Sequence, residues 1–134
     1  MTLKLEIVTP EGTTYSEDVD MVTLPGVEGE MGIYPEHVAL LTQVVPGELT
    51  VRRGGHEEFI AVGDGFVEIT GQRVAILTDM AIRAENIDEA KVEEARRRAE
   101  ARLAERLDDE EAAMINAALA HSVALLKVKR RKRP

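Results

Sequence analysis

Glycine and alanine divide this chain into two parts. All ten glycines lie between residues 12 and 71, and four of the five prolines lie between 10 and 46. Alanine does the opposite, with three residues before position 80 and thirteen after it. Glycine and proline favour turns and interrupt helices, whereas alanine is the best helix former. The sequence therefore predicts a turn-rich first part and a helical second part, with a boundary near residues 80–87.

Short alternating segments fill the first part. The segment LKLEIV (3–8) places Leu3, Leu5 and Ile7 on one side of a strand. Turn signals such as GDG separate such segments every 8–12 residues. Further strands are expected at 18–24, 37–44, 47–53, 57–62, 65–70 and 73–78. Seven or more short strands at this spacing predict an antiparallel sandwich or barrel.

Two helices are expected after the boundary. Asn86 followed by Glu89 has the spacing of a capping box, and Asp108 followed by Glu111 opens a second helix. The connection between them is short, which favours an antiparallel hairpin. The expected apolar stripes are Ala90, Ala95, Ala99 and Leu103 on the first helix, and Ile115, Leu119, Val123 and Leu126 on the second. Alanine buries little area, so this hairpin is predicted to be weakly held and able to move.

Charge and composition exclude several classes of function. Formal net charge is −8, yet residues 127–134 (KVKRRKRP) carry six positive charges, so the rest of the chain carries −14. An acidic protein does not bind nucleic acid broadly; only the tail has the right charge. There is no cysteine, no apolar run near the ~20 residues of a membrane span, and no signal-peptide core in the first residues. We expect membrane association only through a partner.

Residue patterns for catalysis are missing. His37, His56 and His121 have no metal-ligand spacing, and neither serine lies in a nucleophile elbow. The GDG segment at 63–65 lacks the third glycine and the following helix of a dinucleotide site, so it reads as a hairpin turn. We therefore expect a non-catalytic chain without cofactor or metal.

The segment GEMGIYPEH (29–37) stands out among the turns. Its two glycines permit tight turns, Pro35 rigidifies its end, and Met31, Ile33 and Tyr34 are apolar or aromatic. Such residues exposed on a loop tip are typical of a contact patch. The segment is predicted to be a docking loop; the simpler alternative is a compact turn between strands.

Several segments together resemble the ε subunit of bacterial F-type ATP synthase. They are VTPEG near the N-terminus, GEMGIYPEH, PGELTVRRGGHEEFIAVGDGFVEI and VAILTDMAIRAENIDEA, in the same order. The resemblance covers essentially the whole chain. It implies a β-sandwich of about ten antiparallel strands over residues 1–84 and a C-terminal antiparallel two-helix hairpin over 85–134.

The resemblance also implies a place in the central stalk of the enzyme. The sandwich is expected to grip the γ subunit and rest on the ring of c subunits, at the cytoplasmic face of the bacterial inner membrane. The residues that match the ring-facing positions are Glu28, Glu30, Met31 and Gly32, and those facing γ are His37 and Thr42. An acidic Glu30 suits basic or polar groups on the ring.

The hairpin is expected to inhibit ATP hydrolysis by extending along γ to the α and β subunits. The cations of the tail, Lys127, Lys129, Arg130, Arg131, Lys132 and Arg133, would then pair with acidic segments of β. The alternative for such a terminal charge run is a solvated tail without a partner.

Some family members bind ATP on the folded hairpin, and this chain departs from their pattern. Asp88 is kept, Lys91 stands where arginine is expected, and Val92 stands where alanine is expected. Arg98 matches a helping arginine of the first helix, but His121 and Leu125 occupy the matching region of the second. Lysine lacks the bidentate fork that holds phosphate, so weak or absent ATP binding is predicted.

The sequence leaves three candidate functions for the chain. The first is a coupling and inhibitory subunit of the rotor. The second is an ATP-sensing module, against which the changes at the nucleotide positions argue. The third is an unrelated sandwich adaptor whose basic tail binds nucleic acid, which a steep salt dependence of RNA binding would reveal.

Overall fold

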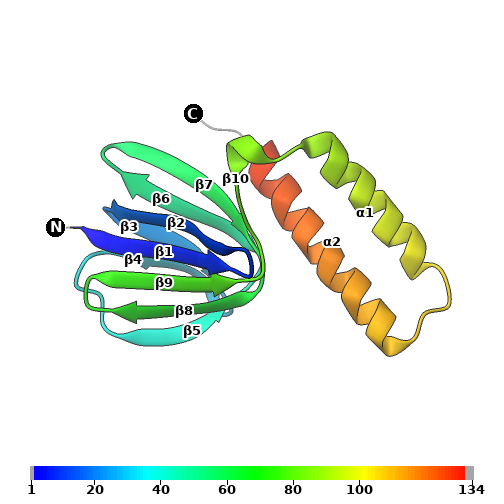
Figure 1. The fold of residues 1–134 in the computed structure, drawn as a ribbon, viewed down its shortest axis with the longest axis horizontal. Coiled ribbons are helices and arrows are strands. Elements are labelled where there is room, and N and C mark those ends of the chain that lie inside the picture. Colours follow the sequence, from blue (N-terminus) through cyan, green and yellow to red (C-terminus); the bar gives the residue numbers. More distant parts are fainter. Residues whose placement is uncertain (1, 132–134) are drawn as a thin grey trace.

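The computed structural model describes residues 2–131 and shows a β-sheet domain with two helices projecting from one end (Figure 1). The strands are β1 (Leu3–Thr9), β2 (Gly12–Val19), β3 (Met21–Gly26), β4 (Gly29–Ile33), β5 (Leu40–Val44), β6 (Gly47–Arg53), β7 (His56–Val62), β8 (Gly65–Thr70), β9 (Arg73–Thr78) and β10 (Ala81–Arg83). The helical elements are a 3-10 turn η1 (Ala84–Asn86), α1 (Glu89–Leu103) and α2 (Asp109–Arg130).

One ten-stranded sheet folds over on itself into a sandwich. Its strand order is β10-β7-β6-β3-β5-β8-β9-β1-β2, with β4 paired to β3 beside this path. All pairs are antiparallel except β1 with β9, which run parallel from Lys4↔Arg73 to Val8↔Leu77. The predicted sandwich followed by a two-helix hairpin is confirmed. The parallel pair was not foreseen, because no local signal relates strands more than 60 residues apart.

The core of the sandwich consists of aliphatic residues from nearly every strand. Leu3, Leu5 and Ile7 are fully buried, as the alternation of β1 predicts. Val22 and Leu24 of β3 and Ile33 of β4 complete the opposite side. No residue of α1 or α2 belongs to this cluster, so the sandwich has a core of its own.

Three strands escaped the sequence analysis. Strand β2 buries only Tyr15 and Val19 and reads as polar. Strand β4 is glycine-rich, and β10 has three residues. The expectation of a loop over 29–37 is wrong in its first half, because Gly29–Ile33 is a strand paired with β3 and Ile33 is buried in the core. Docking by this segment stays a prediction.

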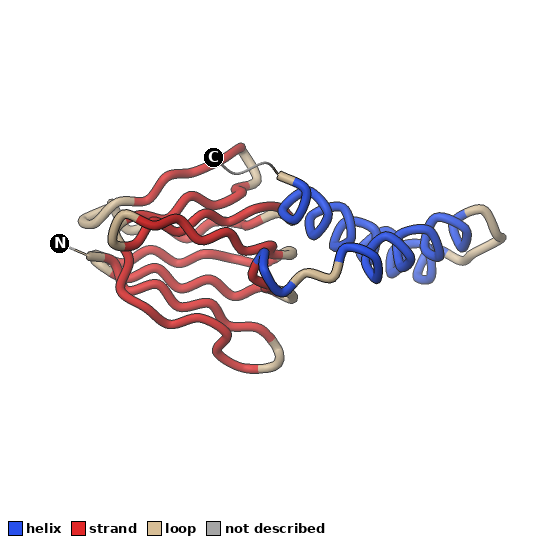
Figure 2. The backbone as a smooth tube through the Cα atoms, turned by 90° about the horizontal axis from the view of Figure 1, so that it is seen from above, coloured by secondary structure: helices blue, strands red, loops and turns tan. Residues whose placement is uncertain are grey.

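The two helices form the predicted antiparallel hairpin, which stands away from the sheet (Figures 1 and 2). The N-cap of α2 is Asp108, whose side chain accepts a 2.7 Å hydrogen bond from the backbone N of Glu111, as expected. The capping box at Asn86 is wrong. Asp88 caps α1 by accepting from the backbone N of Lys91, and Asn86 lies in η1. An Asp directly before the helix outcompetes an Asn two residues earlier.

The seam of the hairpin is thin, as the alanine content predicts. No residue of α1 is buried; Ala95 and Ala99 are partly buried, whereas Ala90 is exposed and Leu103 is 36% exposed. On α2 the predicted stripe is partly wrong, because Val123 is 55% exposed. The buried residues gather in its last turns, namely Ser122, Ala124, Leu125, Leu126 and Val128. This end of α2 contacts β6, β7 and η1, so the hairpin is attached at its base.

Among the described residues, α2 is the one helix long and apolar enough to cross a membrane by length and composition alone. Its best window has a mean hydropathy of 1.2, and 22% of that window is buried. The sequence analysis found no such run, because alanines dispersed among polar residues supply much of this hydropathy. The last turns of α2 place their apolar side chains against the sandwich.

Candidate interaction surfaces

A groove beside the β3–β4 turn collects four of the residues that the resemblance assigns to partners. We call it the β3–β4 groove; it measures about 420 Å³ and is lined by Val27, Glu28, Gly29, Glu30, Met31, Leu40 and Thr42. Glu28 and Glu30 are exposed, whereas Met31 packs on the core. The groove thus combines two carboxylates with an apolar floor.

Glycines allow the tight turn that builds this groove. Gly26 pairs with Gly29 across the turn, and Gly29 has a φ of +123°, in the left-handed region that favours glycine. A Cβ on Gly26 would lie 2.8 Å from the carbonyl O of Gly29. Beyond the turn β4 alternates, so Met31 points inward while Gly32 is exposed on the other face, outside the groove.

Of the two predicted γ contacts, Thr42 lines the β3–β4 groove and His37 does not. Thr42 of β5 pairs with Val67 of β8 and lines the β3–β4 groove beside the predicted ring contacts. His37 lies in the connection between β4 and β5, where its Nδ1 donates to the carbonyl O of Val38 at 2.6 Å. His37 is not among the residues that line the groove.

An exposed apolar face on β5, β8 and β9 was missed. Leu41 is 68% exposed, Phe66 57% and Leu77 55%. Phe66 lies directly opposite Leu77 across the β8–β9 pair, and Leu77 is beside Val8 of β1. We call Val8, Leu41, Phe66 and Leu77 the outer apolar face. The alternation of GFVEIT gave a usable signal, since it places buried Val67 and exposed Phe66 on opposite faces.

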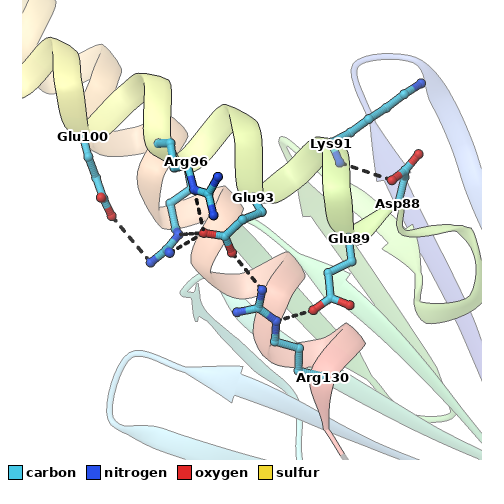
Figure 3. Close-up of polar contacts among 8 residues, drawn as sticks. Asp88, Glu89, Lys91, Glu93, Arg96, Glu100 and Arg130 are labelled. Atoms are coloured by element: carbon cyan, nitrogen blue, oxygen red, sulfur yellow. Dashed lines mark hydrogen bonds and ion pairs between the residues drawn. The ribbon is translucent and has the colours of Figure 1, made fainter.

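The predicted nucleotide positions are used for other contacts. The carboxylate of Asp88 caps α1, and the side chain of Lys91 points away from the ion pairs beside it (Figure 3). Arg98 pairs with Glu94 at 3.1 Å on the exposed side of α1. His121 lies 3.1 Å from Oδ2 of Asp79, and Leu125 is buried beside Val92 in the hairpin base. Asp88 meets Lys91 only through the backbone N that it caps, at 3.2 Å, and Arg98 is paired with Glu94, so the three side chains form no common site.

An ion-pair cluster joins the two helices near the base of the hairpin. Arg130 of α2 lies between Glu89 and Glu93 of α1; it pairs with Glu89 and donates to Glu93 at 2.8 Å (Figure 3). Arg96 also pairs with Glu93 and reaches Glu100. Hydrogen bonds from Arg96 and then Arg130 hold the pKa of Glu93 below its usual range. The carboxylates in turn raise the pKa of both arginines.

The basic tail begins inside the folded structure. Arg131 pairs with Glu48 of β6 and lies over the ring of Phe59, 5.9 Å from its centroid. Lys129 donates to the carbonyl O of Ala84 at 3.3 Å. Lys127 lies with Arg131 in a second groove of about 290 Å³, the α2 groove, whose other wall includes Glu30 and Glu48. Lys132 and Arg133 lie outside the described residues.

Comparison with known proteins gives a consistent result. Residues 2–84 match the beta-sandwich domain of the ATP synthase delta/epsilon chain. The ATP synthase epsilon chain of Dehalococcoides mccartyi is 46% identical over 98% of this chain and 96% of its own length. That of Herpetosiphon aurantiacus is 43% identical over 99% and 98%.

Two solved structures share the fold. A chain from the mitochondrial ATP synthase of Euglena gracilis, in an assembly with OSCP, F1 and c-ring, is 27% identical, with a TM-score of 0.78 over 92% of this chain and 79% of that one. A chain from the central stalk and c-ring of Tetrahymena thermophila mitochondrial ATP synthase is 14% identical, with a TM-score of 0.62 over 96% and 97%. At that identity the second likeness shows the fold alone.

Proposed function

The chain belongs to the ATP synthase delta/epsilon family, and from this premise we propose that it couples rotation of the c-ring, through γ, to the catalytic head and inhibits ATP hydrolysis with its hairpin. The observation that carries the proposal is similarity over nearly the full length, hairpin included, to bacterial ATP synthase epsilon chains. The chain itself is proposed to be non-catalytic. Its place is the cytoplasmic face of the bacterial inner membrane, reached through the complex.

The β3–β4 groove is the proposed ring contact. It presents Glu28 and Glu30 at the rim of a cavity whose floor includes Met31. A loop of the ring with a cationic or polar side chain and an adjoining apolar residue fits this arrangement. Complementary charges fix the register of such a contact more than they add affinity. Gly32 is exposed on the same side of β4 as Glu30, and a Cβ there would lie 3.2 Å from Cε of Met21, so its proposed role is to leave room at the surface beside Glu30.

The outer apolar face is the proposed main contact with γ. Large apolar side chains exposed together on one sheet face are costly in an isolated protein and typical of interfaces. Leu41 and Thr42 are consecutive on β5 and therefore point to opposite faces of the strand, so the outer apolar face and the β3–β4 groove are separate surfaces that meet at β5. His37 would lie at the edge of the same interface.

The hairpin is the proposed regulatory part. It has no residue in the sandwich core, and its main contacts with the sheet come from the end of α2, with Ile87 and Val92 packed beside it. A two-state movement therefore requires loss of a small contact area, without unfolding of the sandwich. In the extended position the cations of the tail would pair with acidic segments of the β subunits, against the alternative of a solvated tail.

An ATP-sensing hairpin is the second candidate, and the observed contacts disfavour it. Arg130 reaches Glu89, the residue next to Asp88, and is engaged by two carboxylates of α1. Phosphate would have to displace both. No contact among the described residues favours the third candidate, a nucleic-acid-binding adaptor.

The test is ATP hydrolysis by an assembled αβγ head with the full chain or with a truncation ending at Arg83. The full chain should inhibit, and the truncation should bind without inhibiting because the sandwich core stays complete. If both bind and neither inhibits, the hairpin is structural in this chain. If neither binds, the proposed place in the stalk is wrong.

A further inference from the structure

The hairpin base has a small apolar contact with the sandwich. Its buried members are Ala61 of β7, Ile87 before α1, and Leu125 and Val128 of α2. The rest of the hairpin extends away from the sheet (Figure 1). With so few buried side chains, polar contacts at this base weigh heavily in the balance between a docked and a released hairpin.

Two consecutive arginines at the base of the hairpin make ion pairs with different parts of the molecule. Arg130 reaches across to Glu89 and Glu93 of α1 and so closes the hairpin on itself. Arg131 reaches to Glu48 of β6 and so ties the hairpin to the sandwich. The side chain of Glu48 is only 7% exposed. The side chain of Arg131 is 56% exposed. Because one partner is shielded from water, this pair is less screened than a pair between two exposed side chains.

The acidic wall beside Arg131 also borders the β3–β4 groove. Glu30 lines both grooves, together with Gly29, whereas Glu28 lines the β3–β4 groove alone. The negative charge of Glu30 attracts Lys127 and Arg131 across the α2 groove, and this attraction favours the docked hairpin. A cation that binds Glu30 from the other groove would weaken that attraction.

We propose that Arg130 and Arg131 form an electrostatic latch on the docked hairpin, and that Glu30 couples occupation of the β3–β4 groove by a cationic partner to release of that latch. The latch itself stands on the contacts above, while the identity of the partner rests on the proposed function. By linkage, release of the hairpin changes the affinity of the groove for a cation by the same factor.

The latch can be tested on the full chain alone. Because the chain has no cysteine, Gln72→Cys on the sandwich and Ala104→Cys at the hairpin tip give two unique label sites for a distance measurement. Arg130→Gln should raise the released population about two- to fivefold, as for an exposed pair. Arg131→Gln should raise it about tenfold or more because Glu48 is buried. Higher salt concentration should reduce the difference in released population between each variant and the wild type.

Matched variants separate the latch from loss of charge in general. Arg106→Gln removes an exposed arginine at the far end of the hairpin and should leave the released population unchanged. Glu48→Gln combined with Arg131→Gln should release less than the sum of the two single effects. If Arg130→Gln and Arg131→Gln behave like Arg106→Gln, the latch is overturned.

The coupling has its own pair of variants. Glu30→Lys should increase the released population, and Glu28→Lys should do so clearly less, because only Glu30 faces the α2 groove. Equal effects of the two would overturn the coupling and leave the latch in place. The label distances can behave as expected while the full chain fails to inhibit the αβγ head. That result would overturn the proposed function and leave the latch in place.

Discussion

The hydroxyl of Tyr15 on β2 donates a 3.3 Å hydrogen bond to Oε1 of Glu58 on β7, and this contact joins the two ends of the folded sheet. Strand β2 is the last in the strand order and β7 the second, next to β10. Arg83 of β10 lies over the Tyr15 ring, 5.2 Å from its centroid, and pairs with Glu58 at 3.6 Å. The seam of the sandwich is therefore closed by a polar cluster around a buried tyrosine.

This seam predicts a stability loss in alkali. Burial, followed by the charge of Glu58, raises the pKa of Tyr15 from 10.0 to about 12. The folded sandwich favours the neutral phenol of Tyr15. The stability that this side chain contributes is therefore complete below pH 10 and is lost as the pH rises from 10 towards 12. Unfolding midpoints measured across this range should fall, and Tyr15→Phe should remove most of that fall. A spectrophotometric titration in which the step that Tyr15→Phe removes lies near pH 10 would contradict the prediction.

Two neighbouring glycines should respond differently to alanine. A Cβ on Gly65 would overlap the backbone carbonyl of Leu77, which cannot move without breaking the β8–β9 pair. Gly65→Ala should cost the sandwich about 1–3 kcal/mol or more in urea unfolding. A Cβ on Gly63 would meet the Asp79 and His121 side chains, which can swing aside. Gly63→Ala should therefore loosen the hairpin more than the sandwich; equal costs at both sites would show that this distinction is wrong.

Acid should release the hairpin. The pKa of Glu93 is lowered from 4.5 by Arg96 and then by Arg130. A carboxylate with a lowered pKa stabilises the packed state above its usual pKa, and this effect disappears as the pH falls through the lower value. The distance between the labelled hairpin tip and the sandwich should change below pH 4.5. Glu93→Gln should lose this transition, whereas Glu94→Gln, whose pair is on the exposed side of α1, should keep it.

Binding of γ should depend on Phe66. Phe66→Ser should weaken binding to the αβγ head by about 2 kcal/mol, roughly 30-fold, if this side chain anchors the interface. Its 57% exposure predicts a change below about 0.5 kcal/mol in unfolding free energy. Val123→Ser is the control, because Val123 is similarly exposed but lies on α2, outside the outer apolar face. It should leave the affinity of the sandwich for the head unchanged. Unchanged affinity for the head in Phe66→Ser would exclude the outer apolar face from the interface.

Nucleotide should bind weakly or not at all. Calorimetric titration of the full chain with ATP at millimolar concentration should give no tight binding, because carboxylates occupy Arg130 and Asp88 caps a helix. If ATP did bind, its phosphates would compete with Glu89 and Glu93 for Arg130. The ion pairs that join α1 to α2 would then break. Tight binding would restore the ATP-sensing candidate.

Local patterns in the sequence predicted much of this molecule. The alternation of Leu3, Leu5 and Ile7 predicted β1, and the loss of glycine after residue 71 predicted the change to helices. The cap at Asp108 was found because a capping residue acts within one turn of chain. Glu28, Glu30 and Met31 were singled out by resemblance to a family, and the structure brings them into one groove.

Contacts between distant segments were decided by the tertiary structure. The two-part organisation, most strands and the hairpin could be predicted from local sequence, because these follow from the backbone preferences of neighbouring residues. Local sequence did not determine that β1 would pair parallel to β9, that Arg131 would meet Glu48 or that Tyr15 would close the seam. Each of these joins residues 43 or more positions apart, and such pairings are selected only when the whole core packs.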